Sequence, residues 1–307
     1  MCRFLSDNTS GAHPNIVSAL LAANEQSAAP YGDDSYSNAL DRAFSQIFDT
    51  SVCVIPCLSG TAANALAISL IAGPTQSVYV HQDAHIYQDE CNAPEFYSGA
   101  RLIPFKDGDC AKSAKLTPEM FKQAELRRGD RHSVQAAAVS IAQINELGEI
   151  YQPDEVRALA NYAHDHGLKL HMDGARFANA VAALNCHPAD ISWRAGVDIL
   201  SFGATKNGCF GAEAVVLFNP EKQQEARYRA KRAGQLVSKM RFIATQLLAY
   251  IKDDLWVVNA RAANQAAAQL AEQLNRFEHV ETKTSGANMI FATLPAYMTA
   301  ALSQVAL

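Results

Sequence analysis

The sequence has little charge and no strong excess of either sign. Its 307 residues carry a net charge of −5, and charged residues make up 19% of the chain, so no basic groove for nucleic acid is expected. The longest weakly polar run, residues 62–73, falls short of the roughly 20 residues that a membrane-spanning helix needs. The first residues lack the apolar core and the cleavage site of a signal peptide. We therefore expect a cytoplasmic protein without nucleic-acid or membrane partners.

The cysteines show no pattern typical of disulfides or of a metal site. There are seven, an odd number, and no Cys-x-x-Cys occurs. Cys53 and Cys57 lie at even spacing in a strand-like run, which favours thiols packed in the core. No grouping of His, Cys, Asp and Glu has the spacing of a closed metal site, so we predict that the protein binds no metal.

Apolar strand-like runs alternate with helical runs along most of the chain. The strand-like runs are residues 51–58, 78–80, 136–144, 168–173, 197–202 and 213–218, and the helical runs are 14–24, 62–71, 154–166, 227–250 and 255–277. Alternation of this kind is typical of an α/β protein with a parallel sheet. The length allows one large domain, predicted over residues 1–225, and connecting helices with a small C-terminal domain over residues 226–307.

Two of the predicted strands end near side chains that could act together. Asp173 ends one strand, and Lys206 follows the next strand in a turn of small residues. A lysine against apolar surroundings can bind an aldehyde as a Schiff base, although a solvated loop lysine would show the same local pattern. With a carboxylate that keeps a pyridine nitrogen protonated, this pair suits pyridoxal 5'-phosphate. His171 faces the same side as Asp173 and is either its orienting partner or a satisfied core histidine.

A turn of Ser59, Gly60 and Thr61 leads from a predicted strand into a predicted helix. Unpaired N–H groups and the helix dipole at such a start attract anions, although an ordinary N-cap uses the same residue types. Because Lys206 and Asp173 occur in the same chain, we expect this turn to hold the phosphate of the cofactor.

Together these segments resemble the low-specificity L-threonine aldolases, which are pyridoxal phosphate enzymes of the aspartate aminotransferase-like fold. The resemblance rests on the residues 59–64 (Ser-Gly-Thr-Ala-Ala-Asn), 173–176 (Asp-Gly-Ala-Arg) and Lys206, and it covers nearly the whole chain. It implies a large α/β domain with a mostly parallel seven-stranded sheet and a small α+β C-terminal domain. Residues 31–36 also resemble a family segment near the cofactor.

The resemblance implies cofactor contacts for further residues. His85 matches a histidine that stacks on the cofactor ring and can serve as a base, so the predicted catalytic residues are Lys206, His85 and Asp173. Glu90 matches another family position. Arg241, with Arg232 nearby, lies near positions that reach the phosphate of a neighbouring subunit, unless both are ordinary exposed arginines.

The resemblance implies substrate contacts at two residues. Arg176 matches an arginine that contacts the phenolic oxygen of the cofactor and the substrate carboxylate, and Ser6 matches a serine that contacts the same carboxylate. Family members carry a further carboxylate-binding arginine beyond the length of this chain. We therefore expect either that Ser6 and Arg176 hold the carboxylate alone or that the chain is truncated.

One segment departs from the family pattern. Many threonine aldolases have Asn-Thr-His after the strand 136–144, and its histidine approaches the substrate hydroxyl, whereas this chain has Asn145-Glu146 there. A different residue in this region, His85 or a water molecule could take the hydroxyl proton.

The resemblance predicts a carbon–carbon lyase, an L-threonine aldolase. It would cleave L-threonine or L-allo-threonine, a small amino acid substrate, to glycine and acetaldehyde. It further implies a homotetramer, a dimer of dimers, with active sites at subunit interfaces. The alternatives on the same scaffold are a phenylserine aldolase, a β-eliminating lyase or an amino acid racemase. Without the C-terminal arginine, a catalytically weak cofactor-binding protein is a further alternative.

Overall fold

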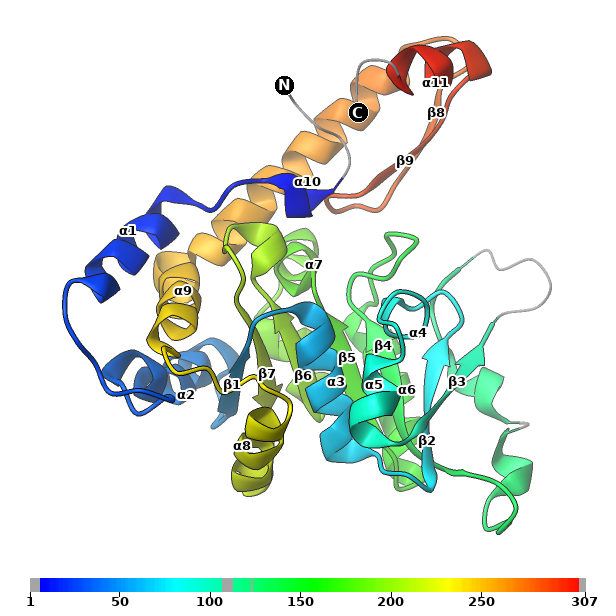
Figure 1. Ribbon diagram of the computed structural model, residues 1–307. Coiled ribbons are helices and arrows are strands. Elements are labelled where there is room, and N and C mark those ends of the chain that lie inside the picture. Colours follow the sequence, from blue (N-terminus) through cyan, green and yellow to red (C-terminus); the bar gives the residue numbers. More distant parts are fainter. Residues whose placement is uncertain (1–5, 107–112, 123, 304–307) are drawn as a thin grey trace.

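The computed structural model describes residues 6–106, 113–122 and 124–303, and its centre is a seven-stranded sheet (Figure 1). The strands are β1 (Cys53–Cys57), β2 (Gln76–His81), β3 (Arg101–Phe105), β4 (Gln135–Ala142), β5 (Lys169–Gly174), β6 (Ile199–Gly203) and β7 (Glu213–Leu217). Their spatial order is β1-β7-β6-β5-β4-β2-β3. All neighbours are parallel except that β7 runs antiparallel to both β1 and β6. The prediction of a mostly parallel seven-stranded sheet is confirmed.

Helices cover both faces of this sheet. They are α1 (Pro14–Asn24), α2 (Ser35–Phe48), α3 (Gly60–Ile71), α4 (His85–Gln88), α5 (Ala93–Ser98), α6 (Pro153–Asp165), α7 (Phe177–Leu184), α8 (Gln223–Arg232), α9 (Arg241–Ile251), α10 (Leu255–Leu274) and α11 (Ala296–Ser303). Short 3-10 turns join several of them, including η1 (Asp7–Thr9) and η6 (Thr205–Asn207). Of the parts of the chain described, no helix combines the length and the apolar character required to cross a membrane.

The core divides into two layers on opposite faces of the sheet. On one face, helices α2, α6, α7 and α9 pack on alternate residues of the central strands, among them Met172 of β5 and Phe202 of β6. On the other face, α3 and α8 pack on β1 and β7, and α3 also packs on β2 and β4. Because side chains alternate along a strand, Met172 faces the first layer while its neighbours His171 and Asp173 face α3.

Close packing at the edge where β5 and β6 end depends on glycine. A Cβ atom on Gly203 would lie 2.5 Å from the carbonyl oxygen of Ala175, and one on Gly174 would lie 2.7 Å from that of Ser201. Real Cβ atoms do not approach backbone that closely, so these two glycines allow the two strand ends to lie against each other.

The structure corrects the predicted helices at two places. Helix α2 was not expected, although Asp34 caps its start and Leu40, Phe44 and Phe48 are buried along one face. The predicted helix 227–250 is two helices, α8 and α9, because the chain turns at residues 233–240, where Gly234 has a φ of 72°.

The C-terminal part extends away from the sheet. Helix α10 leads to an antiparallel hairpin of β8 (Glu281–Thr284) and β9 (Ile290–Thr293), followed by α11 (Figure 1). The loop of this hairpin contacts the N-terminal turn, where the Asn288 side chain donates to the Asp7 carboxylate. The domain boundary at residues 225 and 226 stays a prediction.

The described cysteines are all free, and the core position predicted for Cys53 and Cys57 is confirmed. Cys53, Cys57 and Cys209 are buried in the core, whereas Cys91 is exposed. Burial raises the pKa of Cys53 and Cys57 to about 12, which is typical of inert core thiols. The described residues contain no cluster of His, Cys, Asp and Glu that could hold a metal ion.

Candidate active site

Asp173 and Lys206 lie on neighbouring strands at the same edge of the sheet. Strands β5 and β6 pair in parallel, with Asp173 opposite Ser201, and Lys206 lies in the turn η6 just after β6. The carboxyl ends of parallel strands are where α/β proteins place their ligand sites. Among the described residues, the Lys206 side chain has no hydrogen-bond or ion-pair partner.

The backbone around Lys206 is fixed from two sides. The amide of Ala204 donates to Oε2 of the buried Glu213 at 3.0 Å. The Asn207 side chain donates to the Tyr250 hydroxyl at 2.6 Å and to the Trp256 carbonyl at 2.8 Å. Burial raises the pKa of Glu213 to about 7, although hydrogen bonds from the turn oppose the shift.

A buried amide links Asp173 to His85. Nδ2 of Asn64 donates to Asp173 Oδ2 and to Glu90 Oε1, both at 2.8 Å. Glu90 Oε1 also lies 2.9 Å from His85 Nδ1, and the Ala175 amide donates to Asp173 Oδ1 at 3.0 Å. The hydrogen bond with Glu90 raises the pKa of His85, and the charge of Asp173 adds to this, while burial and the charge of Lys206 oppose it. The predicted residues His85, Glu90 and Asp173 thus form one connected group.

His171 is a satisfied core histidine, one of its two predicted roles. Its Nδ1 lies 2.8 Å from Ser140 Oγ, and its Nε2 lies 3.0 Å from Ser201 Oγ. Burial lowers the pKa of His171 to about 4, which favours the neutral ring. It therefore has no hydrogen bond with Asp173, whose orientation is set by Asn64 and a backbone amide.

The turn of Ser59, Gly60 and Thr61 begins helix α3, as predicted. Ser59 caps the helix by accepting a hydrogen bond from the Ala62 amide at 3.2 Å. The amides of Gly60 and Thr61 have no partner within the described structure, and a Cβ atom on Gly60 would meet no atom within 4 Å. The helix start therefore offers free donors and open space to an anion.

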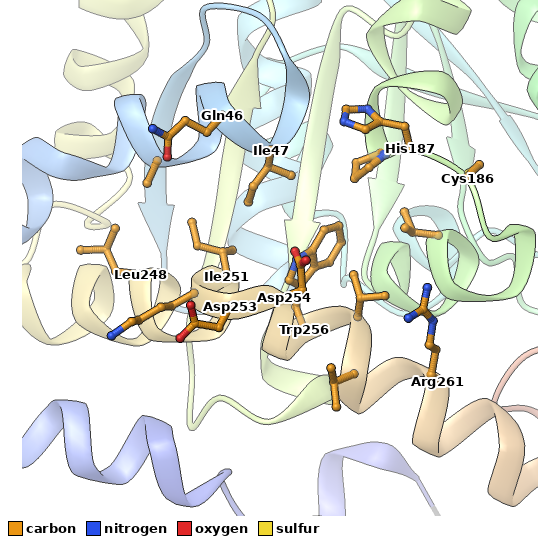
Figure 2. A pocket seen from close by; sticks show the side chains of 16 residues that line it. Gln46, Ile47, Cys186, His187, Leu248, Ile251, Asp253, Asp254, Trp256 and Arg261 are labelled. Atoms are coloured by element: carbon orange, nitrogen blue, oxygen red, sulfur yellow. The ribbon is translucent and has the colours of Figure 1, made fainter.

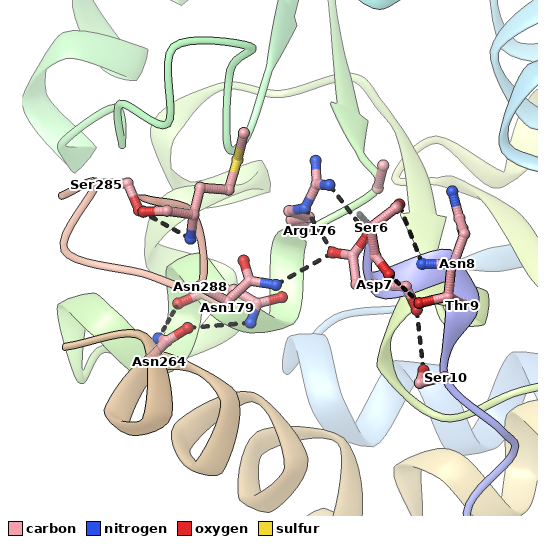
Figure 3. A network of polar contacts seen from close by, with 12 residues as sticks. Ser6, Asp7, Asn8, Thr9, Ser10, Arg176, Asn179, Asn264, Ser285 and Asn288 are labelled. Atoms are coloured by element: carbon pink, nitrogen blue, oxygen red, sulfur yellow. Dashed lines mark hydrogen bonds and ion pairs between the residues drawn. The ribbon is translucent and has the colours of Figure 1, made fainter. Parts of the chain in front are cut away.

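Arg176 is held by the N-terminal turn. Its Nε and Nη2 donate to the two carboxylate oxygens of Asp7, at 2.8 Å and 3.1 Å, and Asn288 donates to Asp7 Oδ2 at 3.1 Å (Figure 3). Burial alone would raise the pKa of Asp7, but the charge and hydrogen bonds of Arg176 outweigh it and lower this pKa. Ser6 is exposed and caps the turn by accepting from the Asn8 amide. Within the part of the chain described, Nη1 of Arg176 has no partner, so its donors are open to another group.

Arg241 lies apart from this group in the described contacts. It begins α9, its guanidinium lies 4.6 Å from the centre of the Phe242 ring, and its buried Nε has no partner among the described residues. The segment before α9 contacts the loop of residues 31–33, since the Tyr31 amide donates to the Ser238 carbonyl. Arg232, also considered for a phosphate contact, is exposed.

Glu146 and Asn145 have different surroundings. Asn145 is buried and shapes its own loop, because its Oδ1 accepts from the amides of Leu147 and Glu149. Glu146 instead accepts a hydrogen bond from the His85 amide at 2.6 Å. Of the two, only Glu146 makes a described contact with the group around Asp173.

A large cavity lies elsewhere. It has a volume of about 920 Å³ and is lined by residues of α2, α7, α9 and α10, including Ile47 and Trp256, and by His187 in the segment after α7 (Figure 2). It belongs to the layer opposite α3, and none of the predicted site residues line it. It therefore does not define the active site.

Sequence reasoning missed the roles of several residues that hold the site together. In the sequence, Asn64 stands out only as the last residue of the segment 59–64, although one amide within the apolar helix 62–71 signals a buried polar contact. Asp7 and Glu213 gave weaker signals, because their partners Arg176 and Ala204 become visible only in the fold.

A family model described as beta-eliminating lyase matches residues 3–296. The chain belongs to this family. Two proteins similar to this chain are both named low specificity L-threonine aldolase. The protein from Pseudomonas aeruginosa is 42% identical over 88% of this chain and 77% of its own length. The protein from Pseudomonas sp. is 40% identical over 91% of this chain and 80% of its own length.

Solved structures of related fold also superpose on this chain. A threonine aldolase from Leishmania major superposes with a TM-score of 0.90 at 28% identity, covering 98% of this chain and 87% of that protein. Aspartate aminotransferase from Thermus thermophilus gives a TM-score of 0.70 at 15% identity, over 92% of this chain and 74% of that one. The latter likeness concerns the fold alone, and it confirms the predicted aspartate aminotransferase-like architecture.

Proposed function

We propose that this protein is a pyridoxal 5'-phosphate-dependent aldolase that cleaves L-threonine or L-allo-threonine to glycine and acetaldehyde. The observation that carries the proposal is the pair of Asp173 and Lys206 at the ends of adjacent strands, together with the open start of helix α3, which packs on the same sheet. Relatives that are 40% and 42% identical carry the name low specificity L-threonine aldolase.

The described residues fit this cofactor by their chemistry. Lys206 would bind its aldehyde carbon, Asp173 its pyridine nitrogen, and Ser59, Gly60 and Thr61 its phosphate. When bound, the cofactor supplies a ring that accepts electrons from the α-carbon of an amino acid. The open space at Gly60 and the free amides of the turn match a phosphate better than an uncharged group.

The residues around the cofactor site divide the remaining work. His85 would cover one face of the ring, in a position fixed by Glu90. Arg176 would bind the substrate carboxylate through Nη1, with Ser6 as a second contact. A carboxylate held at a fixed place sets the direction of the Cα–Cβ bond, and this orientation contributes to the rate.

Exposed apolar residues beside the site support an assembly. Leu58, just before Ser59, and Phe210, four residues after Lys206, are 47% and 60% exposed. Large apolar side chains at a polar site are typical of a surface that another subunit covers. We propose a cytoplasmic homotetramer, a dimer of dimers, in which Arg241 reaches the phosphate in a neighbouring subunit. Sedimentation analysis giving a monomer in the presence of cofactor would contradict this.

Product analysis tests the proposed reaction. The purified protein with cofactor should release glycine and acetaldehyde from L-threonine. Lys206→Ala should abolish this, while Lys122→Ala, at an exposed lysine, should not. The family match makes β-elimination an alternative reaction. An α-keto acid and ammonia as products would indicate it.

Other outcomes identify the remaining alternatives. Benzaldehyde released from phenylserine, with no cleavage of threonine, would indicate a phenylserine aldolase, and a D-amino acid product would indicate a racemase. Cofactor absorbance without turnover of any amino acid would indicate a binding protein.

A further inference from the structure

The loop after β4 holds Glu146 in one place. Gly148 donates its amide to the Asn145 carbonyl, and the Asn145 side chain donates to Glu149 Oε2 at 3.0 Å. Gly148 has a φ of 74°, and a Cβ atom there would lie 2.6 Å from Ser285 in the loop of the C-terminal hairpin. The loop is therefore closed on itself and packed against the hairpin, which limits the positions open to the Glu146 side chain.

Only one oxygen of the Glu146 carboxylate accepts a hydrogen bond from another described residue. Oε1 accepts the His85 amide at 2.6 Å, and Oε2 has no hydrogen bond to another of the residues described. Burial raises the pKa of Glu146 to about 7, although the hydrogen bond from His85 opposes the shift, and the nearby charge of Asp173 adds to it. The groups that face Glu146 include His85 on α4, Asp173 on β5 and Tyr151 just beyond its own loop.

The other carboxylates of the site already have partners. Both oxygens of Asp173 accept hydrogen bonds, and His85 Nδ1 is paired with Glu90. The Glu90 side chain is fully buried, so substrate has no access to it. Asp7 pairs with Arg176 through both oxygens. Glu146 is partly accessible, and its Oε2 has no bond to another described residue, so it is the carboxylate best able to exchange a proton with a ligand.

We propose that Glu146 is a catalytic residue that takes the hydroxyl proton of the β-hydroxy amino acid substrate through Oε2. This inference rests on the proposed aldolase function. As the proton moves to Glu146, the C–O bond becomes the carbonyl of the aldehyde and the Cα–Cβ bond breaks. The electron pair stays with the glycine fragment, which then takes up a proton from solvent at Cα. The proton on Glu146 returns to solvent before the next turnover.

Two reactions of the holoenzyme separate this role from a structural one. Cleavage of L-threonine needs a base at the hydroxyl, whereas exchange of the glycine α-hydrogen in D₂O involves no hydroxyl. Glu146→Gln keeps an oxygen that can accept from the His85 amide, so the fold should persist. We expect cleavage to fall by roughly 10²- to 10⁴-fold, the usual contribution of a general base, with exchange within about threefold of wild type.

A matched variant and two further readouts complete the test. Glu149→Gln disturbs the same loop, because Glu149 accepts from Ala114 and Asn145, and it should change cleavage and exchange in parallel. In wild type the kcat/KM for cleavage should rise with pH through a pKa near that of Glu146, and this limb should vanish in Glu146→Gln. In the protein without cofactor, one ¹³C-glutamate carboxyl signal that titrates near neutral pH should be absent from the variant.

The outcomes separate the two proposals. If wild type cleaves threonine and Glu146→Gln cleaves it within fivefold of wild type, or loses cleavage and exchange together, the role of Glu146 is wrong and the aldolase function stands. If wild type exchanges the glycine α-hydrogen but releases no aldehyde, the aldolase function itself is wrong, and the role of Glu146 with it.

Discussion

Asn64 joins the carboxylates of Glu90 and Asp173, so its removal should weaken the whole group. Asn64→Ala deletes two hydrogen bonds of 2.8 Å, to Glu90 Oε1 and Asp173 Oδ2. A hydrogen bond to a charged partner contributes about 1.5–3 kcal/mol, and the effects of coupled neighbours do not add fully. We therefore expect the free energy of unfolding to fall by about 3 kcal/mol.

Urea unfolding of the protein without cofactor measures this loss. Ser69→Ala is the control, because Ser69 is buried on the same helix and donates one hydrogen bond of 2.8 Å to the Leu66 carbonyl. A single bond between uncharged groups contributes about 1 kcal/mol, so this variant should lose less. Asn64→Ala should also bind pyridoxal 5'-phosphate more weakly, because Asp173 loses its orienting donor. Equal unfolding free energies for the two variants, with unchanged cofactor affinity, would refute this reasoning.

Three further perturbations test other parts of the site. The folded protein keeps the proton on Glu213 up to a pKa of about 7, against 4.5 as its ordinary value, so this group's contribution to stability is present at low pH and is lost as pH rises to 7. As the pH rises from 4.5 to 8, the free energy of unfolding of Glu213→Gln, measured in urea, should therefore increase by about 3 kcal/mol relative to that of wild type. A difference that does not change with pH would contradict the raised pKa of Glu213. Gly203→Ala would force a Cβ against backbone and should lower both stability and cleavage, unlike Gly11→Ala, where a Cβ meets no atom within 4 Å; equal effects would be evidence against the close strand packing. Asp7→Asn removes the charge that orients Arg176, so the KM for L-threonine should rise by roughly three- to tenfold with little change in kcat, and an unchanged KM would show that Asp7 does not orient it.

Much of the sheet could be predicted because its strands are short apolar runs with clear ends. In the sequence, Asp173 ends one strand, a helix follows, and Lys206 comes after the next strand. This order predicts that the two residues lie at the ends of neighbouring parallel strands. Helix α2 was missed because the polar side chains of Asp41, Arg42 and Ser45 interrupt its apolar residues. Its signal was the i, i+4, i+8 spacing of Leu40, Phe44 and Phe48 after an Asp N-cap.

The supporting contacts of the site could not be predicted in the same way. Asp7 and Arg176 are far apart in the sequence, as are Asn64 and Asp173, and each contact exists only once the sheet is formed. No local pattern distinguishes His171 as a core residue from His171 as a partner of Asp173. The two serines that bind it decide this, and they lie on the strands β4 and β6 at its sides.

The central claim is that Lys206 and Asp173 form a working cofactor site. The most direct measurement is the absorbance spectrum of the purified protein with pyridoxal 5'-phosphate, before and after borohydride reduction, followed by peptide mapping. We predict an absorbance band at about 420 nm that reduction removes, with the reduced cofactor attached to Lys206. No such band with added cofactor, or attachment at another lysine, would contradict the claim.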